Sequence, residues 1–362
     1  MKIGILTFNS AYNFGAVLQC YGLFATLAAM NYDVKVIDYR PEYLASYKPI
    51  FGIRDFLSRH ILTLPSRLKR YLYWRRIYKL YEKFERKEML LTRSCKDNQE
   101  LSEILQEFDC VIVGSDQIWN SRFNGKDSAW YGTLRNPTQR WITYAASIGK
   151  ANINALDLEH LEKALYLFNS ISVRESSLGE LLHSINQNIP LKPTVLDPTL
   201  LASPEIWKKW NNPTEKGNYI VTYQARECDD VFRIAELLSM QLDNAKIIPI
   251  DLYGNVVNHG YKTKIIDPPG FVSLISGAHC VVTTSFHGTA FSIITQTPFY
   301  TLRLNDGNDG RVSNLLDNLN LSSRLIDHND NPRFERIDYT DALSRLAKYR
   351  ESSLNYLKTA LG

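Results

Sequence analysis

The alternation of short apolar runs with longer stretches of helical periodicity constrains the fold of this chain more than any other feature. The runs have the length of buried strands, and each intervening stretch can form a helix that crosses back over a sheet. This pattern predicts an α/β protein with doubly wound parallel sheets. The expected strands are 2–8, 34–38, 110–114, 142–147, 171–174 and 194–196, followed by 219–223, 246–250, 280–284 and 299–302.

A break in the alternation predicts two domains. The chain has 362 residues, which is too long for one ordinary core. The stretch 203–216 is rich in Pro and Asn and is the candidate linker. We therefore expect two Rossmann-like domains, 1–209 and 215–339, that face each other across a cleft. A final helix over 340–362 is expected to cross back to the first domain.

Positive charge is concentrated in a helical insertion over about residues 52–92. Residues 51–90 hold eleven Lys and Arg against four Asp and Glu, although the whole chain has a formal net charge of only +4. Aromatic and aliphatic residues recur among them at helical spacing. One interpretation is a helix that packs its aromatic face on the core, and the other is an interfacial surface that meets anionic lipid headgroups. No recognition motif for nucleic acid accompanies the charge.

The cysteine, histidine and glycine patterns exclude several classes of chemistry. The five cysteines are scattered without a CxxC pair, and neither a signal-peptide pattern nor an apolar run of membrane-spanning length occurs, so a cytoplasmic protein is expected. The seven histidines form no HExxH motif, and no metal or cofactor is predicted. The absence of GxGxxG and GxxxxGK[ST] makes dinucleotide binding and P-loop NTPase activity weak hypotheses.

Polar residues follow two strands of the first half, at the ends where open α/β sheets bind ligands. The loop after the first strand is either substrate-facing or a simple turn with an Asn cap. The segment 114–120, GSDQIWN, holds a carboxylate, two amides and an indole, which suits the hydroxyls and the apolar face of a sugar, although Ser115 or Asp116 as a helix cap is the simpler alternative. The candidate acceptor-binding residues are Asn13, Gly15, Gln19, Gln117, Trp119 and Asn120.

Two further strand ends carry groups that suit an anion. Arg174 lies at the end of one strand, where its guanidinium can fork onto a carboxylate or phosphate, or can form a surface ion pair. After the strand at 280 comes TTSFHGT, which combines hydroxyls, an imidazole and a glycine at a predicted helix N-terminus. Unsatisfied N–H groups and the helix dipole favour an anion there. The candidate donor-binding residues are Arg174, Ser285, Phe286, His287, Gly288 and Thr289.

The motifs GSDQIWN (114–120), YAASIG (144–149), SVRE (172–175), LDPTLL (196–201) and SFHGTAFSIITQTPFYTL (285–302), with NFGAVLQ (13–19), together resemble the polysaccharide pyruvyl transferase family. The resemblance spans about residues 1–320. It implies a GT-B-like shape and transfer of the enolpyruvyl group of phosphoenolpyruvate to two hydroxyls of a sugar, which closes a ketal. Many relatives carry an arginine two residues before the histidine, where this chain has Ser285; Arg226, Arg303 or Arg311 are candidates to supply the missing charge.

The resemblance also suggests roles for three catalytic residues. His287 would protonate the donor or bind its phosphate, Arg174 would clamp an anionic group, and Asp116 would orient or deprotonate the acceptor. The expected partners are phosphoenolpyruvate and a sugar or lipid-linked oligosaccharide in capsular or exopolysaccharide synthesis, with peripheral contact at the cytoplasmic membrane face. The alternatives are a GT-B glycosyltransferase with a nucleotide-sugar donor and a non-catalytic glycan-binding subunit of a capsule-assembly complex.

Overall fold

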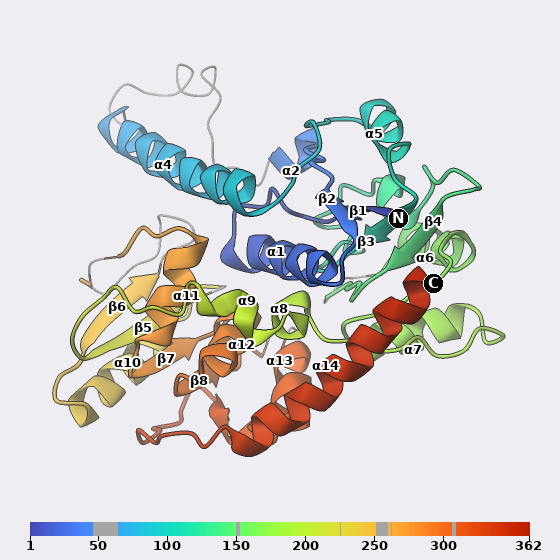
Figure 1. Cartoon of the computed structure of the whole chain (residues 1–362). Helices are drawn as coiled ribbons and strands as arrows, with labels where there is room; N and C mark the ends of the chain where they lie inside the picture. The colour runs from blue at the N-terminus through green and yellow to red at the C-terminus, as the bar shows by residue number, and fades with distance from the viewer. Residues whose placement is uncertain (46–63, 150–152, 225, 251–259, 262, 306–308) are drawn as a thin grey trace. The chain divides into compact units, whose positions relative to one another are not determined.

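The computed structural model describes residues 1–45, 64–149, 153–224, 226–250, 260–261, 263–305 and 309–362. The chain forms two compact units, each built from segments that are distant in sequence (Figure 1). The first unit comprises Met1–Tyr47, Glu85–Ile206 and Ser344–Gly362, and the second comprises Lys48–Phe84 and Trp207–Leu343.

The first unit is built on a parallel sheet with the strand order β2-β1-β3-β4. Every residue of β3 is buried, because helices cover both faces, as a parallel sheet requires. The predicted strands 171–174 and 194–196 occur only as isolated parallel bridges, from Val173 to Ala146 and to Thr194. The strands are β1 (Lys2–Leu6), β2 (Asp33–Val36), β3 (Cys110–Val113) and β4 (Arg140–Thr143).

Several helices of the first unit begin at recognisable caps. Asn13 caps α1 by accepting a hydrogen bond from the Ala16 amide at 2.7 Å, and Asn154 forms a capping box with Asp157 at the start of α6. The helices are α1 (Phe14–Ala29), α2 (Glu42–Ala45), α5 (Asn98–Leu105), α6 (Ala155–Leu167), α7 (Ser176–Ile185) and α8 (Pro198–Leu201), with the 3₁₀ turn η2 (Ser128–Tyr131). The short helix α9 (Pro204–Lys208) lies within the predicted linker, at the division between the units.

The last helix, α14 (Thr340–Leu361), contributes residues 344–361 to the first unit. The Tyr356 hydroxyl donates to the Thr143 carbonyl at 2.8 Å, at the end of β4. The Ser353 hydroxyl oxygen accepts from the Leu196 amide at 3.0 Å. These bonds attach α14 to the end of β4 and to the segment that follows the bridge at Thr194.

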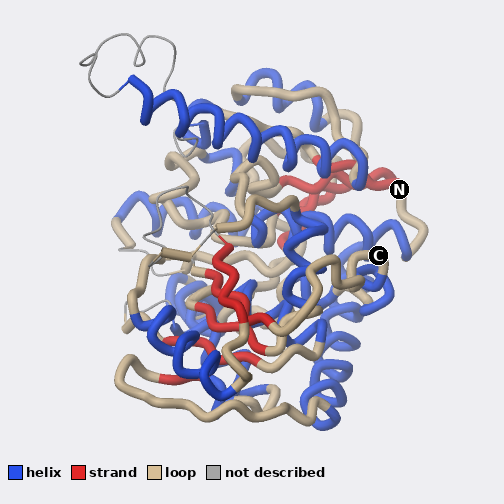
Figure 2. The backbone as a smooth tube through the Cα atoms, turned by 90° about the vertical axis from the view of Figure 1, so that its left-hand side faces the viewer, coloured by secondary structure: helices blue, strands red, loops and turns tan. Residues whose placement is uncertain are grey.

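The second unit is built on a five-stranded parallel sheet with the order β6-β5-β7-β8-β9. As in the first unit, the strands lie among helices (Figure 2). The predicted strands at 219, 246 and 299 are found with the same bounds, whereas the short strand β9 was not predicted. The strands are β5 (Tyr219–Tyr223), β6 (Lys246–Ile250), β7 (Cys280–Thr283), β8 (Phe299–Leu302) and β9 (Leu325–Ile326). The helices are α10 (Asp230–Gln241), α11 (Pro268–Ser276), α12 (Phe286–Thr295) and α13 (Asp309–Asn318), with the 3₁₀ turn η3 (Ser322–Arg324).

The basic insertion contains the long helix α4 (Leu64–Glu88), and residues 46–63 before it lie outside the described part of the chain. The prediction placed the whole insertion in the first domain, but its residues up to Phe84 group with the second unit. Phe84 packs on Trp210 of that unit, with ring centroids 5.5 Å apart.

The predicted α/β class with two doubly wound parallel sheets is confirmed by the two parallel sheets of the chain.

Gly114 occupies a position after β3 that excludes a side chain. Its φ is +116°, and a Cβ atom there would lie 2.4 Å from the Tyr144 carbonyl oxygen. We expect Gly114→Ala to lower the free energy of unfolding by about 2–3 kcal/mol, because backbone strain and a clash with rigid backbone add. Thermal and urea unfolding followed by circular dichroism would measure this loss.

Gly217 provides the matched control for that substitution. It also has a positive φ, +94°, but no atom lies within 4 Å of the position of its Cβ. Gly217→Ala therefore keeps the strain and removes the clash, and we expect a loss of only about 1 kcal/mol. Equal losses in the two variants would contradict the steric explanation at Gly114.

Candidate functional site

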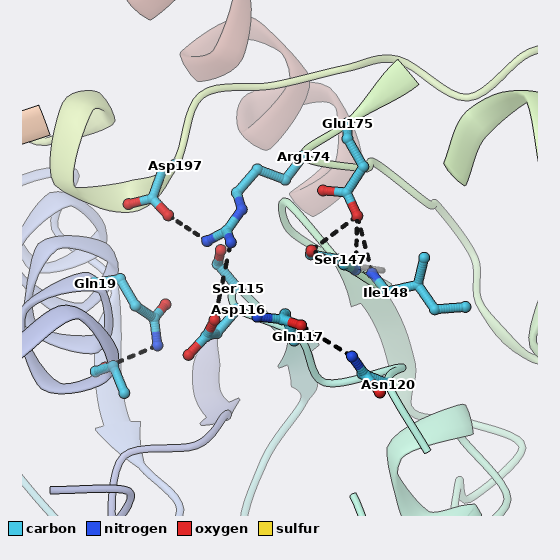
Figure 3. A network of polar contacts seen from close by, with 12 residues as sticks. Gln19, Ser115, Asp116, Gln117, Asn120, Ser147, Ile148, Arg174, Glu175 and Asp197 are labelled. Atoms are coloured by element: carbon cyan, nitrogen blue, oxygen red, sulfur yellow. Dashed lines mark hydrogen bonds and ion pairs between the residues drawn. The ribbon is translucent and has the colours of Figure 1, made fainter. Parts of the chain in front are cut away.

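A buried arginine and two carboxylates form the centre of the candidate site in the first unit (Figure 3). Arg174 follows the bridge residue Val173, and its side chain is only 3% exposed. Its Nη1 donates to Oδ2 of Asp197 at 2.6 Å, and its Nη2 lies 3.9 Å from Oδ1 of Asp116. The surface ion pair that the sequence allowed for Arg174 is therefore replaced by a buried one.

The two carboxylates differ in exposure. The Asp197 side chain is fully buried, and its Oδ1 also accepts from the amide and the hydroxyl of Thr199 at the start of α8. The Asp116 side chain is 16% exposed. Burial alone would lower the pKa of Arg174, but the charges of Asp197 and Asp116 outweigh burial and raise it. A permanently charged guanidinium thus holds the more accessible carboxylate of Asp116 in place.

Glu175, the next residue, fixes the loop that follows β4. Its Oε1 accepts from the Ser147 hydroxyl at 2.8 Å, the Ile148 amide at 2.9 Å and the Gly149 amide at 3.2 Å (Figure 3). The motif at 144–149 is therefore tied to the motif at 172–175 by one carboxylate oxygen. The small residues of the loop let its amides converge on that oxygen.

Three buried oxygens near this network have no hydrogen-bond partner within the described residues. They are Oε1 of Gln19, Oγ of Ser115 and Oε2 of Glu175. Buried polar atoms in folded proteins are normally satisfied by protein, water or ligand. Gln19 is connected to the loop after β3 through Thr7, whose hydroxyl accepts from Gln19 Nε2 and donates to the Ser115 carbonyl, each at 3.0 Å. These three oxygens therefore have hydrogen-bonding capacity that no described residue uses.

The structure contradicts the sugar-stacking role expected for Trp119. Its side chain has no exposed surface, its Nε1 donates to the Trp130 carbonyl at 3.0 Å, and its ring stacks on Tyr131. A ring with both faces in the core cannot receive a pyranose. Asn120 is also buried, and its amide donates to Oε1 of Gln117 at 2.9 Å, so it shapes the loop.

The other acceptor residues lie near the start of α1 or in the loop after β3. Asn13 caps α1, Gly15 is the second residue of that helix, and Gln19 is fully buried on it. The simple-cap alternative for Asn13 therefore describes its side chain. Residues 114–120 form bends and turns, so neither Ser115 nor Asp116 caps a helix. Gln117 and Asp116 are the partly exposed residues of that segment.

The predicted donor segment lies in the second unit, between β7 and α12. Ser285 is at the N-cap position, but its side chain makes no capping hydrogen bond. Phe286 and His287 are partly exposed, with their rings nearly perpendicular and their centroids 5.2 Å apart. The helix therefore begins with an imidazole in its first turn, as predicted from the sequence.

Two threonines that were expected to face an anion bind the protein backbone instead. The Thr283 hydroxyl donates to the Tyr223 carbonyl at 2.5 Å, and the Thr289 hydroxyl donates to the Ser285 carbonyl at 3.1 Å. Both side chains are fully buried, so the direct donor contact predicted for Thr289 is wrong. Gly288 allows the close packing of α12 on this strand end, because a Cβ atom there would lie 2.3 Å from Oγ1 of Thr283.

The structure brings together Asp116 and Arg174 in the first unit and places His287 in the second. Sequence reasoning missed Asp197 and Glu175, although both lie within the motifs quoted for the family resemblance. Asp197 directly precedes a proline that starts α8, which is the pattern of a helix cap and gave no indication of an ion pair 23 residues away. Sequence reasoning also missed a cluster of Cys228, Asp230 and His328 in the second unit.

Comparisons with solved structures give likenesses at low identity. A UDP-GlcNAc 2-epimerase from Neisseria meningitidis bound to UDP-GlcNAc is 13% identical, with a TM-score of 0.48 over 99% of this chain and 94% of that chain. The E. coli heptosyltransferase WaaC with ADP-2-deoxy-2-fluoro heptose is 15% identical, with a TM-score of 0.39 over 83% of this chain and 88% of that chain. Comparison with curated protein sequences gives no match.

The family comparison covers most of the chain. The sequence model of the family described as polysaccharide pyruvyl transferase matches residues 13–306. This range contains each motif discussed above, from the start of α1 to the residues after β8. The chain therefore belongs to the polysaccharide pyruvyl transferase family and is a transferase.

Proposed function

We propose that this chain transfers the enolpyruvyl group of phosphoenolpyruvate to two hydroxyls of a sugar in a lipid-linked glycan, during capsular or exopolysaccharide synthesis. One sugar hydroxyl adds to C2 of the donor while C3 takes up a proton. The second hydroxyl then displaces phosphate from C2, which closes the ketal. The reaction needs an acid near C3, a base near the attacking hydroxyl and a cationic or N–H-rich phosphate site.

The start of α12 is the observation that supports this donor most directly. Its first-turn amides and the partly exposed imidazole of His287 offer hydrogen-bond donors to a phosphate or carboxylate. Ser285 replaces an arginine that many relatives carry. Arg226 is the best candidate for the missing charge, because its carbonyl accepts from the Thr284 hydroxyl at 3.3 Å, which ties its backbone to this turn.

The network around Asp116 supports a role in acceptor binding. Asp116 is the accessible carboxylate of an otherwise buried ion-paired group, and the buried oxygens of Gln19, Ser115 and Glu175 near it have no hydrogen-bond partner among the described residues. We assign Asp116 as the base that takes the proton of the attacking hydroxyl. Arg174 is paired with Asp197 and therefore orients Asp116, in addition to any contact with an anionic group of the substrate.

Thermal unfolding with a panel of ligands tests the donor. We expect phosphoenolpyruvate to raise the unfolding midpoint of the full chain, because a ligand that binds only the folded state stabilises it. Phosphate release with a lipid-linked oligosaccharide then tests turnover. Stabilisation by a nucleotide-sugar alone would favour the glycosyltransferase alternative, and no response to either donor would favour a glycan-binding subunit.

Asp116→Asn separates the acceptor step from donor binding. The amide keeps the shape of the side chain but cannot take up a proton, so we expect phosphate release with acceptor to fall about 100-fold. Stabilisation by phosphoenolpyruvate should be unchanged. Asp338→Asn, at an exposed position next to the start of α14, is the control and should retain normal turnover. Normal turnover in Asp116→Asn would remove Asp116 from the mechanism.

Helix α4 bears on the proposed contact with the cytoplasmic membrane face. Trp74, Tyr81 and Phe84 are buried, which favours the packing interpretation of its aromatic residues. Its exposed basic residues support a purely electrostatic contact with anionic lipid. Co-sedimentation with phosphatidylserine vesicles should fall steeply with salt, and no binding at low salt would reject the contact. The exposed basic residues of α4 are Arg75, Arg76, Lys79, Lys83, Arg86 and Lys87.

No described helix is long and apolar enough to span a membrane.

A further inference from the structure

Cys228, Asp230 and His328 bring three metal-ligating atoms together in the second unit. Cys228 lies in the turn between β5 and α10, Asp230 is the first residue of α10, and His328 follows β9. Their ligand atoms lie within 4.8 Å of one another, and among the described residues this is the group that meets that condition. The sequence gave no indication of it, because His328 is 100 residues from Cys228.

The three atoms converge in a way that fits a shared cation. Sγ of Cys228 lies 3.8 Å and Oδ2 of Asp230 lies 2.9 Å from the same imidazole nitrogen, Nδ1 of His328. Around a tetrahedral zinc ion, the bond lengths of sulfur, nitrogen and oxygen ligands imply S···N and N···O separations of about 3.6 and 3.3 Å. Both observed separations are within a few tenths of an ångström of these values.

The same convergence argues against a catalytic triad of thiol, imidazole and carboxylate. In such a triad one ring nitrogen takes the proton of the nucleophile, while the N–H of the opposite ring nitrogen donates to the carboxylate. Here the thiol and the carboxylate both face Nδ1. One nitrogen cannot accept from Cys228 while it donates to Asp230, but it can ligate a metal that both neighbours also ligate.

Arg233 holds the cluster in place through Oδ1 of Asp230 and leaves Oδ2 of that carboxylate facing His328. Its Nε donates to Oδ1 of Asp230 at 2.9 Å, and its Nη1 donates to Oδ1 of Asn331 at 2.9 Å. The loop that carries His328 is thereby attached to α10. A site that is already assembled loses less conformational entropy on binding.

We propose that Cys228, Asp230 and His328 bind one Zn²⁺ ion, with water as the fourth ligand. Thiolate and imidazole favour zinc over Mg²⁺ or Ca²⁺, which prefer oxygen ligands. The thiol loses its proton to solvent when the metal binds. The ion would join the loops after β5 and β9.

Zinc titration of the full chain tests the site. The chain is first stripped with a chelator, the chelator is removed, and zinc is then added. We expect the protein to retain one zinc per chain after gel filtration, measured by plasma mass spectrometry. His328→Gln should weaken binding by about 100-fold or more, since even outer-shell changes cost about 10–100-fold. His279→Gln, which changes an exposed histidine of the same unit, should bind zinc as the unmodified chain does.

Cadmium provides an independent readout of the thiolate. We expect the ultraviolet absorption of a cadmium–thiolate bond in the unmodified chain and its loss in Cys228→Ser. Unfolding midpoints of the metal-free variants, compared with that of the unmodified chain, separate loss of the ligand from loss of the fold. No zinc binding by the unmodified chain, equal binding by His328→Gln, or a cadmium band that persists in Cys228→Ser would each overturn the proposal.

Discussion

Replacement of His287 by glutamine is expected to reduce pyruvyl transfer by about 1000-fold, because a positioned proton donor contributes about 10²–10⁴-fold to such a reaction. Glutamine can still donate a hydrogen bond but cannot deliver a proton near neutral pH. Because the His287 side chain is partly exposed, the fold should tolerate the change. Phosphate release in the presence of donor and acceptor would measure the effect.

Donor binding distinguishes the two roles considered for His287. If the imidazole acts mainly as an acid, His287→Gln should still be stabilised by phosphoenolpyruvate while turnover is lost. If it mainly holds the phosphate, both should be lost. His279→Gln, which changes an exposed histidine of the same unit, is the control and should keep normal turnover. Near-normal turnover in His287→Gln would remove this residue from the mechanism.

Asp197→Asn is expected to lower the free energy of unfolding by about 3–5 kcal/mol. The substitution preserves the shape of the side chain and its suitability as a helix cap, but it removes the principal counter-charge of Arg174. A buried guanidinium would then depend on Asp116, whose oxygen is 3.9 Å away. Hydrogen exchange of peptides from the first unit, read by mass spectrometry, would locate the loss.

A double-mutant cycle separates the ion pair from other contacts of Asp197. Arg174→Met removes the positive charge and keeps most of the side-chain volume. In the double variant no charge of this pair is left buried alone, so the combined loss should be well below the sum of the two single losses. Additive losses would contradict strong coupling between Arg174 and Asp197.

Much of the fold could be predicted because its strands are apolar runs bounded by turn residues. The segments at 219–223 and 299–302 are continuous buried runs, and their bounds are those of β5 and β8. Strand β9 has only two residues, too few for any periodicity, and its pairing with β8 depends on tertiary contacts. The bridges at Val173 likewise depend on neighbouring strands more than on the local sequence.

The candidate site was predictable by region but not by orientation. Because Asp116, Arg174 and His287 lie at or just after the ends of predicted strands, the sequence identified them as candidate site residues. It could not show that Trp119 faces the core, because an indole beside polar residues suits a sugar site and a packed turn equally well. Residue contacts over long separations, such as Arg174 with Asp197 or Cys228 with His328, leave no spacing pattern in the sequence.

The assignment of residues 344–361 to the first unit has a consequence for the order of folding during translation. That unit contains Met1 and also the end of α14, so its last helix leaves the ribosome only after the whole second unit. The hydrogen bond from Tyr356 to the Thr143 carbonyl at the end of β4 can form only then. Nascent chains stalled before residue 344 should therefore be cleaved by protease within the first unit more readily than the finished chain.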